Sequence, residues 1–500
     1  MKTQFSRELS CAFAILLALL LPRPVIGDDR RPRLVVDDNK VECPNATFSR
    51  IQDAVDAATP GATIRVCKGN YAEQVAIHKP LMINADSGAV LMPGTMQRNT
   101  TSLLDGSPLA TAILVADTTD VSVEGLIVDG ANNGVPQCSP RLFGIAFQNA
   151  SGAISHVAIR NFKLGTGLGD CQSGTGIFVQ SGGGGVSNVE IEKSTIHDFQ
   201  KNGITANEAG THVSVRGNVV TGIGPTSGAA QNGVQIGFGA QGAISRNTVT
   251  NNVWSPCTAA DTCTAVATNI LVTHSDGVEV TDNGVGINQV GIFIHGNQGL
   301  VARNETFASS VFDGIRLEGD GNRLRHNQVF NGAEAGIFIA GNNNVVEHNK
   351  ITEAAVGILK ETGSLGNLIR FNQVFDTPIA LQDPSLQGLA GVVSPERQRY
   401  GFSWVLAGPV HAWKRWADLA TPCRIWREGH EVCVGWQGLR SPAADPAQLR
   451  QRTSRIRRAG TAGLACHWSH LRLPSNAGCH AATRYFLQPA SDAVPRLLER

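Results

Sequence analysis

Seven asparagines recur along the second half of this 500-residue chain, the last five of them at nearly constant spacing. The last four gaps are 21, 23, 22 and 23 residues, and the seven are Asn218, Asn247, Asn283, Asn304, Asn327, Asn349 and Asn372. A period in this range indicates a solenoid, in which each repeat is one turn stacked on the next. Asn tolerates the left-handed conformation of a one-residue corner, and its amide can bond to the amides of the turns above and below. We therefore expect these residues to form a structural ladder.

A second motif, a glycine followed by an apolar, a variable and an apolar residue, comes about 13 residues before the ladder positions, as at 291–294, 314–317 and 336–339. Alternation with a period of two over three to five residues, broken by Gly and Asn, indicates very short strands. No helical period of ten or more residues is visible. The repeats therefore predict an all-β chain of roughly ten coils, about 50 Å long at ~4.8 Å per strand.

The N-terminal region carries a further signature, which consists of CPNATFSRIQDAVDAA at 43–58, a Pro-Gly turn at 60–61 and Gly-Asn-Tyr at 69–71. It resembles the opening of secreted right-handed parallel β-helix proteins of the pectin-lyase-like superfamily. The resemblance covers residues 41 to about 385. It implies a right-handed parallel β-helix with a short N-terminal capping helix, whose apolar face would be Phe48, Ile51, Val55 and Ala58. It implies little about activity, because one fold hosts many functions.

The chain divides into four expected regions. Residues 1–27 have the pattern of a signal peptide, with basic residues, a short apolar stretch at 11–21 and small residues before Asp28. The stretch is too short to span a bilayer, so we expect a secreted protein, periplasmic or extracellular, without stable membrane insertion. Residues 28–40 are an expected linker, 41–388 the β-helix domain and 389–500 an atypical tail.

Six cysteines of the expected β-helix fall in three local pairs: Cys43 with Cys67, Cys138 with Cys171, and Cys257 with Cys263. In an oxidising compartment three disulfides are the simplest interpretation. A metal site is the rival interpretation, but no Cys-x-x-Cys pair or histidine cluster accompanies these residues. We expect no cofactor, and calcium has no sequence support.

The tail differs in composition from the coils. Residues 395–500 contain six of the seven Trp residues and 15 Arg against one Lys, and they show no coil period. Such a composition is typical of GC-rich DNA translated in another frame, so one hypothesis is a frameshift after about residue 388. The alternative is a genuine basic C-terminal domain. Translation of the gene in its other frames decides between them.

Stacked coils align their outward-facing residues into columns. Rows of Phe and amide side chains suit a long, neutral, hydroxyl-rich ligand, and we expect a polysaccharide or cell-surface glycan to contact Phe178, Gln180, Asn207, Gln235, Phe293 and Phe338. The net charge of +1 argues against nucleic acid as a partner.

One dense set of ionisable residues lies on the same expected face. His295 precedes Glu318 by one coil, and Arg316 and Asp313 lie beside Glu318. An imidazole and a carboxylate about one strand spacing apart can serve as base and acid, with the arginine holding a carboxylate of a uronic polymer. We therefore take His295, Arg316 and Glu318 as catalytic candidates. The alternative is a set of solvated ion pairs on the surface.

The chain departs from the active-site motifs of the superfamily, since the Asn-x-Asp, Gly-His-Gly and Arg-x-Lys motifs of polygalacturonases and the Asp-Pro-His-Asp motif of mannuronan epimerases do not occur in its coils. Three functions stay open. The first is binding or recognition of polysaccharide without turnover. The second is a carbohydrate-active enzyme, a lyase, hydrolase or epimerase, acting on uronic-acid-rich glycans. The third is a structural or adhesive surface protein.

Overall fold

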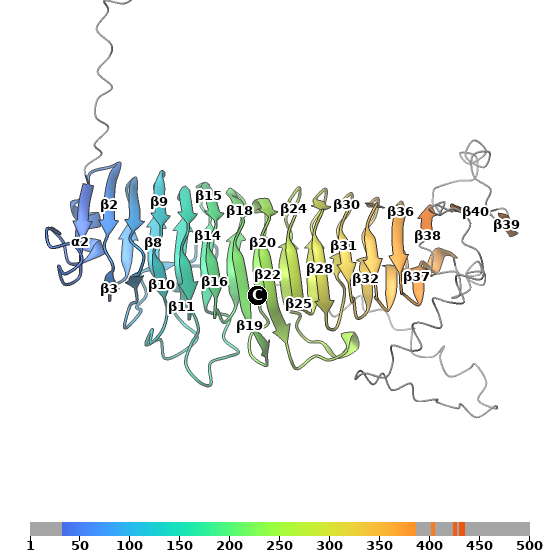
Figure 1. Cartoon of the computed structure of the whole chain (residues 1–500), viewed down its shortest axis with the longest axis horizontal. Coiled ribbons are helices and arrows are strands. Elements are labelled where there is room, and N and C mark those ends of the chain that lie inside the picture. Colours follow the sequence, from blue (N-terminus) through green and yellow to red (C-terminus); the bar gives the residue numbers. More distant parts are fainter. Residues whose placement is uncertain (1–32, 387–401, 406–423, 428–429, 436–500) are drawn as a thin grey trace, which may run out of the picture.

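The computed structural model describes residues 33–386, 402–405, 424–427 and 430–435. Short parallel strands wind into one elongated stack of coils (Figure 1). The expected signal peptide, residues 1–27, and most of the expected tail, residues 389–500, lie outside the described residues. Each complete coil contributes one strand to each of three faces, so the stack is a parallel β-helix.

Face 1 is a continuous sheet of twelve strands. These are β4 (Val75–Ile77), β8 (Pro108–Ala116), β11 (Arg141–Gln148), β14 (Thr175–Gln180), β17 (Asn202–Asn207), β20 (Asn232–Gly237), β23 (Thr268–Thr273), β26 (Val290–His295), β29 (Ile315–Leu317), β32 (Ala335–Ile339), β35 (Val356–Lys360) and β37 (Ile379–Gln382). These twelve strands agree with the expected stack of roughly ten coils, which continues through β35 and β37 at the C-terminal end. The short strand β7 (Thr100–Thr101) adds an antiparallel pairing to β8.

The other two faces are formed by the remaining strands of each coil. Face 2 contains β1 (Arg33–Val36), β2 (Ala62–Val66), β5 (Leu81–Ala85), β9 (Val121–Glu124), β12 (Gly152–Ser155), β15 (Ser187–Glu192), β18 (Thr211–Arg216), β21 (Gln241–Ser245), β24 (Glu279–Thr281), β27 (Leu300–Ala302), β30 (Arg323–Arg325), β33 (Val345–Glu347) and the start of β36 (Leu368–Phe375). Face 3 contains β3 (Gly69–Tyr71), β6 (Ala89–Leu91), β10 (Ile127–Asp129), β13 (Ala158–Arg160), β16 (Thr195–His197), β19 (Val219–Thr226), β22 (Thr248–Trp254), β25 (Gly284–Asn288), β28 (Glu305–Ser309), β31 (Gln328–Phe330), β34 (Lys350–Thr352) and the end of β36. Beyond β36, the strands β38 (Phe402–Val405), β40 (His430–Gly435) and β39 (Arg424–Arg427) pair antiparallel in turn.

The expected capping helix is confirmed as α2 (Ile51–Ala57), which covers the first coil at the blue end of the stack (Figure 1). Ile51 and Val55 are buried against the core. The Glu73 carboxylate accepts the N–H groups of Ile51 (2.7 Å) and Gln52 (3.0 Å), so it satisfies donors that the first turn leaves free. Strand β1 pairs with β2. The coil stack therefore begins within the segment 28–40 that the sequence analysis assigned to a linker.

The asparagine ladder is confirmed in its hydrogen bonding. Each Nδ2 donates to the Oδ1 of the next ladder asparagine at 2.9–3.0 Å. The same Nδ2 donates to a backbone carbonyl of the preceding coil at 2.9–3.1 Å. All seven side chains are buried, so the ladder replaces the water that these amides would otherwise bind.

Of the two expected reasons for asparagine at these positions, amide bonding between coils is confirmed and the left-handed backbone is wrong. None of the seven ladder residues has a positive φ. The left-handed corner falls one residue earlier, at φ values of 55° to 67°, in Gly217, Arg246, Asp282, Arg303, His326, His348 and Phe371. Asparagine is therefore selected for its two-sided amide and not for its backbone preference.

All three expected disulfides are present, with Cα separations of 6.4, 5.2 and 4.7 Å. Cys43–Cys67 ties the N-terminal cap, and Cys138–Cys171 and Cys257–Cys263 tie loops beside face 1. Among the described residues, no helix has the length and apolar character to cross a bilayer.

Candidate functional site

The expected row of exposed phenylalanines on face 1 is absent, because Phe178, Phe293 and Phe338 are buried. Phe178 stacks on Phe143 with ring centroids 4.8 Å apart. Phe293 packs against the segment 254–266, and Phe338 lies under a guanidinium group described below. The residues inserted between coils form loops that cover outward-facing side chains, which the column argument did not consider.

The amide side chains of the expected row are hydrogen-bonded to other residues of the protein. The Leu103 N–H donates to Gln180 Oε1 (2.9 Å), so the loop before β8 lies over this residue. Gln235 donates to Asn207 Oδ1 (3.1 Å) and accepts from Asn202 Nδ2 (3.2 Å). Gln180 and Gln235 are buried, and only Asn207 of the six expected contact residues is partly exposed.

The catalytic candidates lie in a partly buried charge cluster around Arg316, not among solvated ion pairs. Arg316 projects outward from β29, and its side chain is only 10% exposed. Its Nη1 donates to Asp313 Oδ2 and its Nε to Glu318 Oε1, both at 2.8 Å. Glu334 Oε2 lies 3.6 Å from Nη1, and the guanidinium carbon sits 3.9 Å from the centre of the Phe338 ring. Arg316 is thus engaged on several sides and is not free to hold a substrate carboxylate.

Burial and charge act in opposite directions in this cluster. Burial alone would lower the pKa of Arg316, but Asp313 and Glu318 raise it overall. Asp313 is completely buried, and burial raises its pKa to about 7 in spite of the attraction of Arg316. Asp313 Oδ1 has no hydrogen-bond partner among the described residues. The arrangement holds Arg316 rigidly, and Arg316 in turn fixes the orientation of Glu318.

A partly exposed line of side chains follows the carboxyl ends of seven successive strands of face 1, from β17 to β35. We name it the edge row, and it consists of Glu208, Phe238, His274, His295, Glu318, Ala340 and Glu361. At ~4.8 Å per strand the row is about 29 Å long. The rings of Phe238 and His274 stack with centroids 5.7 Å apart, and those of His274 and His295 lie 4.7 Å apart. Phe238 is 37% exposed and supplies the aromatic surface that the buried phenylalanines do not.

Several groups in the edge row have shifted pKa values. Burial lowers the pKa of His295, a shift that Glu318 opposes and His274 reinforces. Burial raises the pKa of Glu208 and of Glu361. Shifts of opposite sign in a partly open row are typical of functional sites, where one group must be a base and another an acid.

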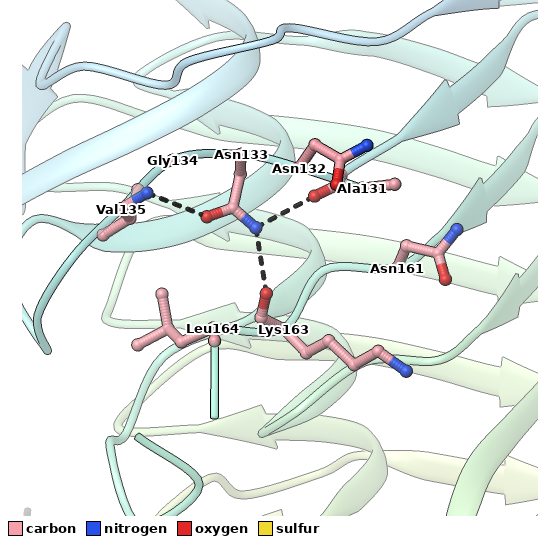
Figure 2. Close-up of a pocket in the computed structure, with 10 residues that line it drawn as sticks. Ala131, Asn132, Asn133, Gly134, Val135, Asn161, Lys163 and Leu164 are labelled. Atoms are coloured by element: carbon pink, nitrogen blue, oxygen red, sulfur yellow. Dashed lines mark hydrogen bonds between the residues drawn. The ribbon is translucent and has the colours of Figure 1, made fainter. Parts of the chain in front are cut away.

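A cavity of about 400 Å³ lies away from the edge row, beside the ends of β10 and β13 (Figure 2). The Asn133 amide lies at its centre and donates to the carbonyls of Gly130 and Lys163, both at 2.9 Å, while it accepts from the Val135 N–H at 3.1 Å. No pair of carboxylates lines this cavity. Its polar groups hold two loops together and offer no acid–base chemistry.

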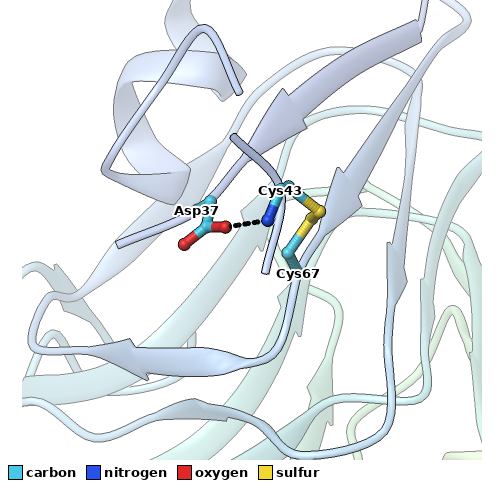
Figure 3. Close-up of side chains that lie close together, drawn as sticks. All are labelled: Asp37, Cys43 and Cys67. Atoms are coloured by element: carbon cyan, nitrogen blue, oxygen red, sulfur yellow. Dashed lines mark hydrogen bonds between the residues drawn. A yellow bond between two sulfur atoms is a disulfide. The ribbon is translucent and has the colours of Figure 1, made fainter. Parts of the chain in front are cut away.

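The side chains close enough to share a metal ion, among the described residues, lie in the N-terminal cap. One group is Asp37, Cys43 and Cys67, but its two cysteines form a disulfide and Asp37 accepts the N–H of Cys43 (Figure 3). Asp37 also accepts the N–H groups of Asn39 (3.2 Å) and Lys40 (3.0 Å), which is the pattern of a carboxylate that stabilises a turn. The residues present do not fit a metal site in this group.

Residues 175–374 match the family model described as right handed beta helix region. The described coils have the fold of a right-handed parallel β-helix. The fold implied by the resemblance to the pectin-lyase-like superfamily is therefore confirmed. No curated protein matches the sequence of this β-helix protein.

Three solved structures are similar to this β-helix protein at low identity. A GH136 lacto-N-biosidase from Eubacterium ramulus is 13% identical with a TM-score of 0.48, over 70% of this chain and 68% of its own. An alginate lyase from Paenibacillus sp. str. FPU-7 is 15% identical with a TM-score of 0.34, over 67% of this chain and 97% of its own. The A-module of a mannuronan C-5 epimerase from Azotobacter vinelandii is 15% identical with a TM-score of 0.38, over 67% and 93%. No residue role is transferred from them.

The sequence analysis found part of the edge row and missed the rest. It placed His295 and Glu318 next to each other, and the structure puts them at aligned positions of β26 and β29. It missed Glu361, although 357–359 carries the same Gly-apolar-apolar start as other coils, because the column was followed only to Ala340. It also missed Phe238, the residue directly after β20. The available signal was position: the row is filled by the residue directly after the face 1 strand, except at His295, which is the last residue of β26.

The charge cluster makes stability depend on pH through Asp313. A carboxyl whose folded pKa is about 7, above its unfolded value near 3.9, stabilises the fold below the unfolded value and loses that contribution as the pH rises to 7 and beyond. We expect the β-helix to lose stability between pH 4 and 8 relative to an Asp313→Asn variant. Thermal unfolding of both proteins at several pH values measures this, and a constant difference across the range would contradict it.

Proposed function

We propose that the protein binds a neutral glycan chain along the edge row. The observation that carries the proposal is a continuous, partly exposed line of aromatic and hydrogen-bonding side chains over seven coils. At about 29 Å it matches an extended chain of several sugar units. Phe238 offers an apolar surface for a sugar ring, and the neighbouring carboxylates and imidazoles can bond to hydroxyl groups.

The charges favour a neutral glycan over a uronic acid polymer. Acidic residues outnumber basic ones around the row, with Glu208, Glu318 and Glu361 in it and Asp313 and Glu334 beside it, against Arg316 and, near Glu208, Arg141. The lowered pKa of His295 keeps this residue largely neutral at pH 7, so it adds little positive charge. A polyanion would meet like charge, and Arg316 is already bound to the protein's own carboxylates.

Secretion is part of the same proposal. Three disulfides among the described residues support an oxidising compartment, periplasmic or extracellular. A glycan ligand is accessible in either place.

The test is calorimetric titration of the protein with neutral hexasaccharides of glucose, galactose and N-acetylglucosamine, and with hexagalacturonate. We expect binding of a neutral chain and about tenfold weaker affinity for Phe238→Ala, which corresponds to loss of one aromatic contact. Phe307→Ala is the matched control, because Phe307 is 39% exposed but lies on face 3. Equal affinity of Phe238→Ala and the wild type, or preference for hexagalacturonate, would contradict the proposal.

A further inference from the structure

Glu318 and Glu361 lie in one column of the edge row and are separated by a single small residue. The N–H of Ala340 donates to the carbonyl of Leu317 at 2.8 Å, and the N–H of Glu361 donates to that of Ile339 at 2.8 Å. These bonds continue the parallel ladder from β29 through β32 to β35, so the two glutamates are two strand spacings apart, about 9.6 Å between their backbones. Ala340 leaves space between the two carboxyl groups.

The two glutamates have different surroundings. Glu318 accepts the Nε–H of Arg316 through Oε1, which pairs its ionised form with a fixed cation. Glu361 has no ion pair among the described contacts, and burial raises its pKa, a shift that Arg316 opposes and Glu318 reinforces. Burial therefore raises the pKa of the Glu361 carboxyl, whereas the Glu318 carboxylate is hydrogen-bonded to a fixed guanidinium.

We propose that Glu361 and Glu318 hydrolyse a glycosidic bond of the bound glycan with inversion of the anomeric carbon, a step that rests on the proposed function. A separation of roughly 6.5–9.5 Å between an acid and a base carboxyl leaves room for a water molecule as well as the sugar. The backbones of the two residues are about 9.6 Å apart, and glutamate side chains that lean toward each other across Ala340 bring their carboxyl groups within that range. Arg316 is a positioning residue, since it acts through Glu318.

The reaction balances without any further reactant. Glu361 gives its proton to the glycosidic oxygen as the bond from that oxygen to the anomeric carbon breaks. Water attacks the opposite side of that carbon, and the Glu318 carboxylate takes the proton that the water releases. The products are an alcohol and a hemiacetal of inverted configuration, and proton exchange with solvent restores both carboxyl groups.

The experiment incubates the full protein with the neutral hexasaccharides used for titration and measures reducing ends, with proton NMR of the first product. We expect cleavage with inversion and a loss of at least about 100-fold for Glu361→Gln and for Glu318→Gln. Both variants should bind within a fewfold of the wild type, which shows that they are folded. Glu305→Gln is the matched control, because Glu305 is exposed at the start of β28 on face 3, and it should cleave within about twofold of the wild type.

A rescue experiment separates the two roles. Sodium azide should restore turnover of Glu318→Ala by attacking in place of water, giving a glycosyl azide of inverted configuration, and should not restore Glu361→Gln. A hexasaccharide that binds and is never cleaved overturns this inference and leaves glycan binding intact. A retained anomer, or undiminished cleavage by Glu361→Gln, also overturns it. If no hexasaccharide binds, the proposed function fails first and this inference fails with it.

Discussion

Replacing Asn304 with alanine should lower the free energy of unfolding by about 3 kcal/mol or more. Asn304 Oδ1 accepts both the backbone N–H and the Nδ2 of Asn283 at 3.0 Å, and its own Nδ2 bonds to Val280 O (2.9 Å) and Asn327 Oδ1 (3.0 Å). The truncation removes the acceptor of the Asn283 N–H and of one Nδ2–H of Asn283, whose other Nδ2–H still bonds to Ile244 O, and it removes a donor to Val280 O; each buried group left without a partner costs about 1–3 kcal/mol. Urea unfolding followed by circular dichroism measures the loss.

The matched control is Asn342→Ala, in a partly exposed ladder that alternates carboxylate and amide side chains, Asp276, Asn297, Asp320 and Asn342. Asn342 Oδ1 accepts the Leu365 N–H at 2.8 Å, but water can replace this bond. We expect a change below about 1 kcal/mol for this variant. An equal loss in free energy of unfolding for the two variants would show that burial does not determine how much a ladder side chain contributes to stability.

The second large effect is expected for Arg316→Met, which should destabilise the protein by about 3–5 kcal/mol at pH 7. Methionine keeps the contact with Phe338 but removes the cation that Asp313, Glu318 and Glu334 share. A buried carboxylate without its partner must take up a proton or unfold the surroundings. The loss should therefore shrink at low pH, and unfolding curves at pH 5 and pH 7 measure it.

Arg303→Met provides the comparison for a surface pair. Arg303 Nε lies 2.7 Å from Asp282 Oδ1, with the two side chains 52% and 35% exposed. Solvent screens such a pair, so we expect a much smaller loss of stability for Arg303→Met than for Arg316→Met. An equally small loss for Arg316→Met would mean that the cluster behaves as a solvated ion pair, the alternative considered from the sequence.

The coil architecture was predictable because a stack repeats its local rules. Inward-facing Ile315 and Leu317 must be apolar in every coil, and an amide at the Asn304 position must match those above and below. Such constraints leave a period in the sequence. The backbone reason for the ladder was not predictable in the same way, because the left-handed corner at Arg303 or His326 is occupied by residues with no common chemistry.

The site was only half predictable for a related reason. A column argument finds which residues point outward, as for Phe293 and Arg316, but it cannot tell whether a loop covers them. Covering segments such as 254–266 come from insertions that break the period and carry no repeat signal. Glu361 and Phe238 each follow directly after a face 1 strand, so both positions could have been predicted from the sequence. The pairing of Arg316 with three carboxylates depends on side-chain directions that sequence spacing does not give.

The stacking of coils also restricts the distances between two functional groups of this protein to a few fixed values. Residues in one column are separated by whole multiples of about 4.8 Å, and Glu318 and Glu361 are two such steps apart because the coil of Ala340 lies between them. Loss of that one coil would reduce the separation of the two glutamates to one strand spacing, near the ~5–5.5 Å between carboxyl groups that is typical of retaining glycosidases. Deletion of one repeat would thus exchange the spacing of an inverting glycosidase for that of a retaining one, because the number of coils between two residues sets the distance between them.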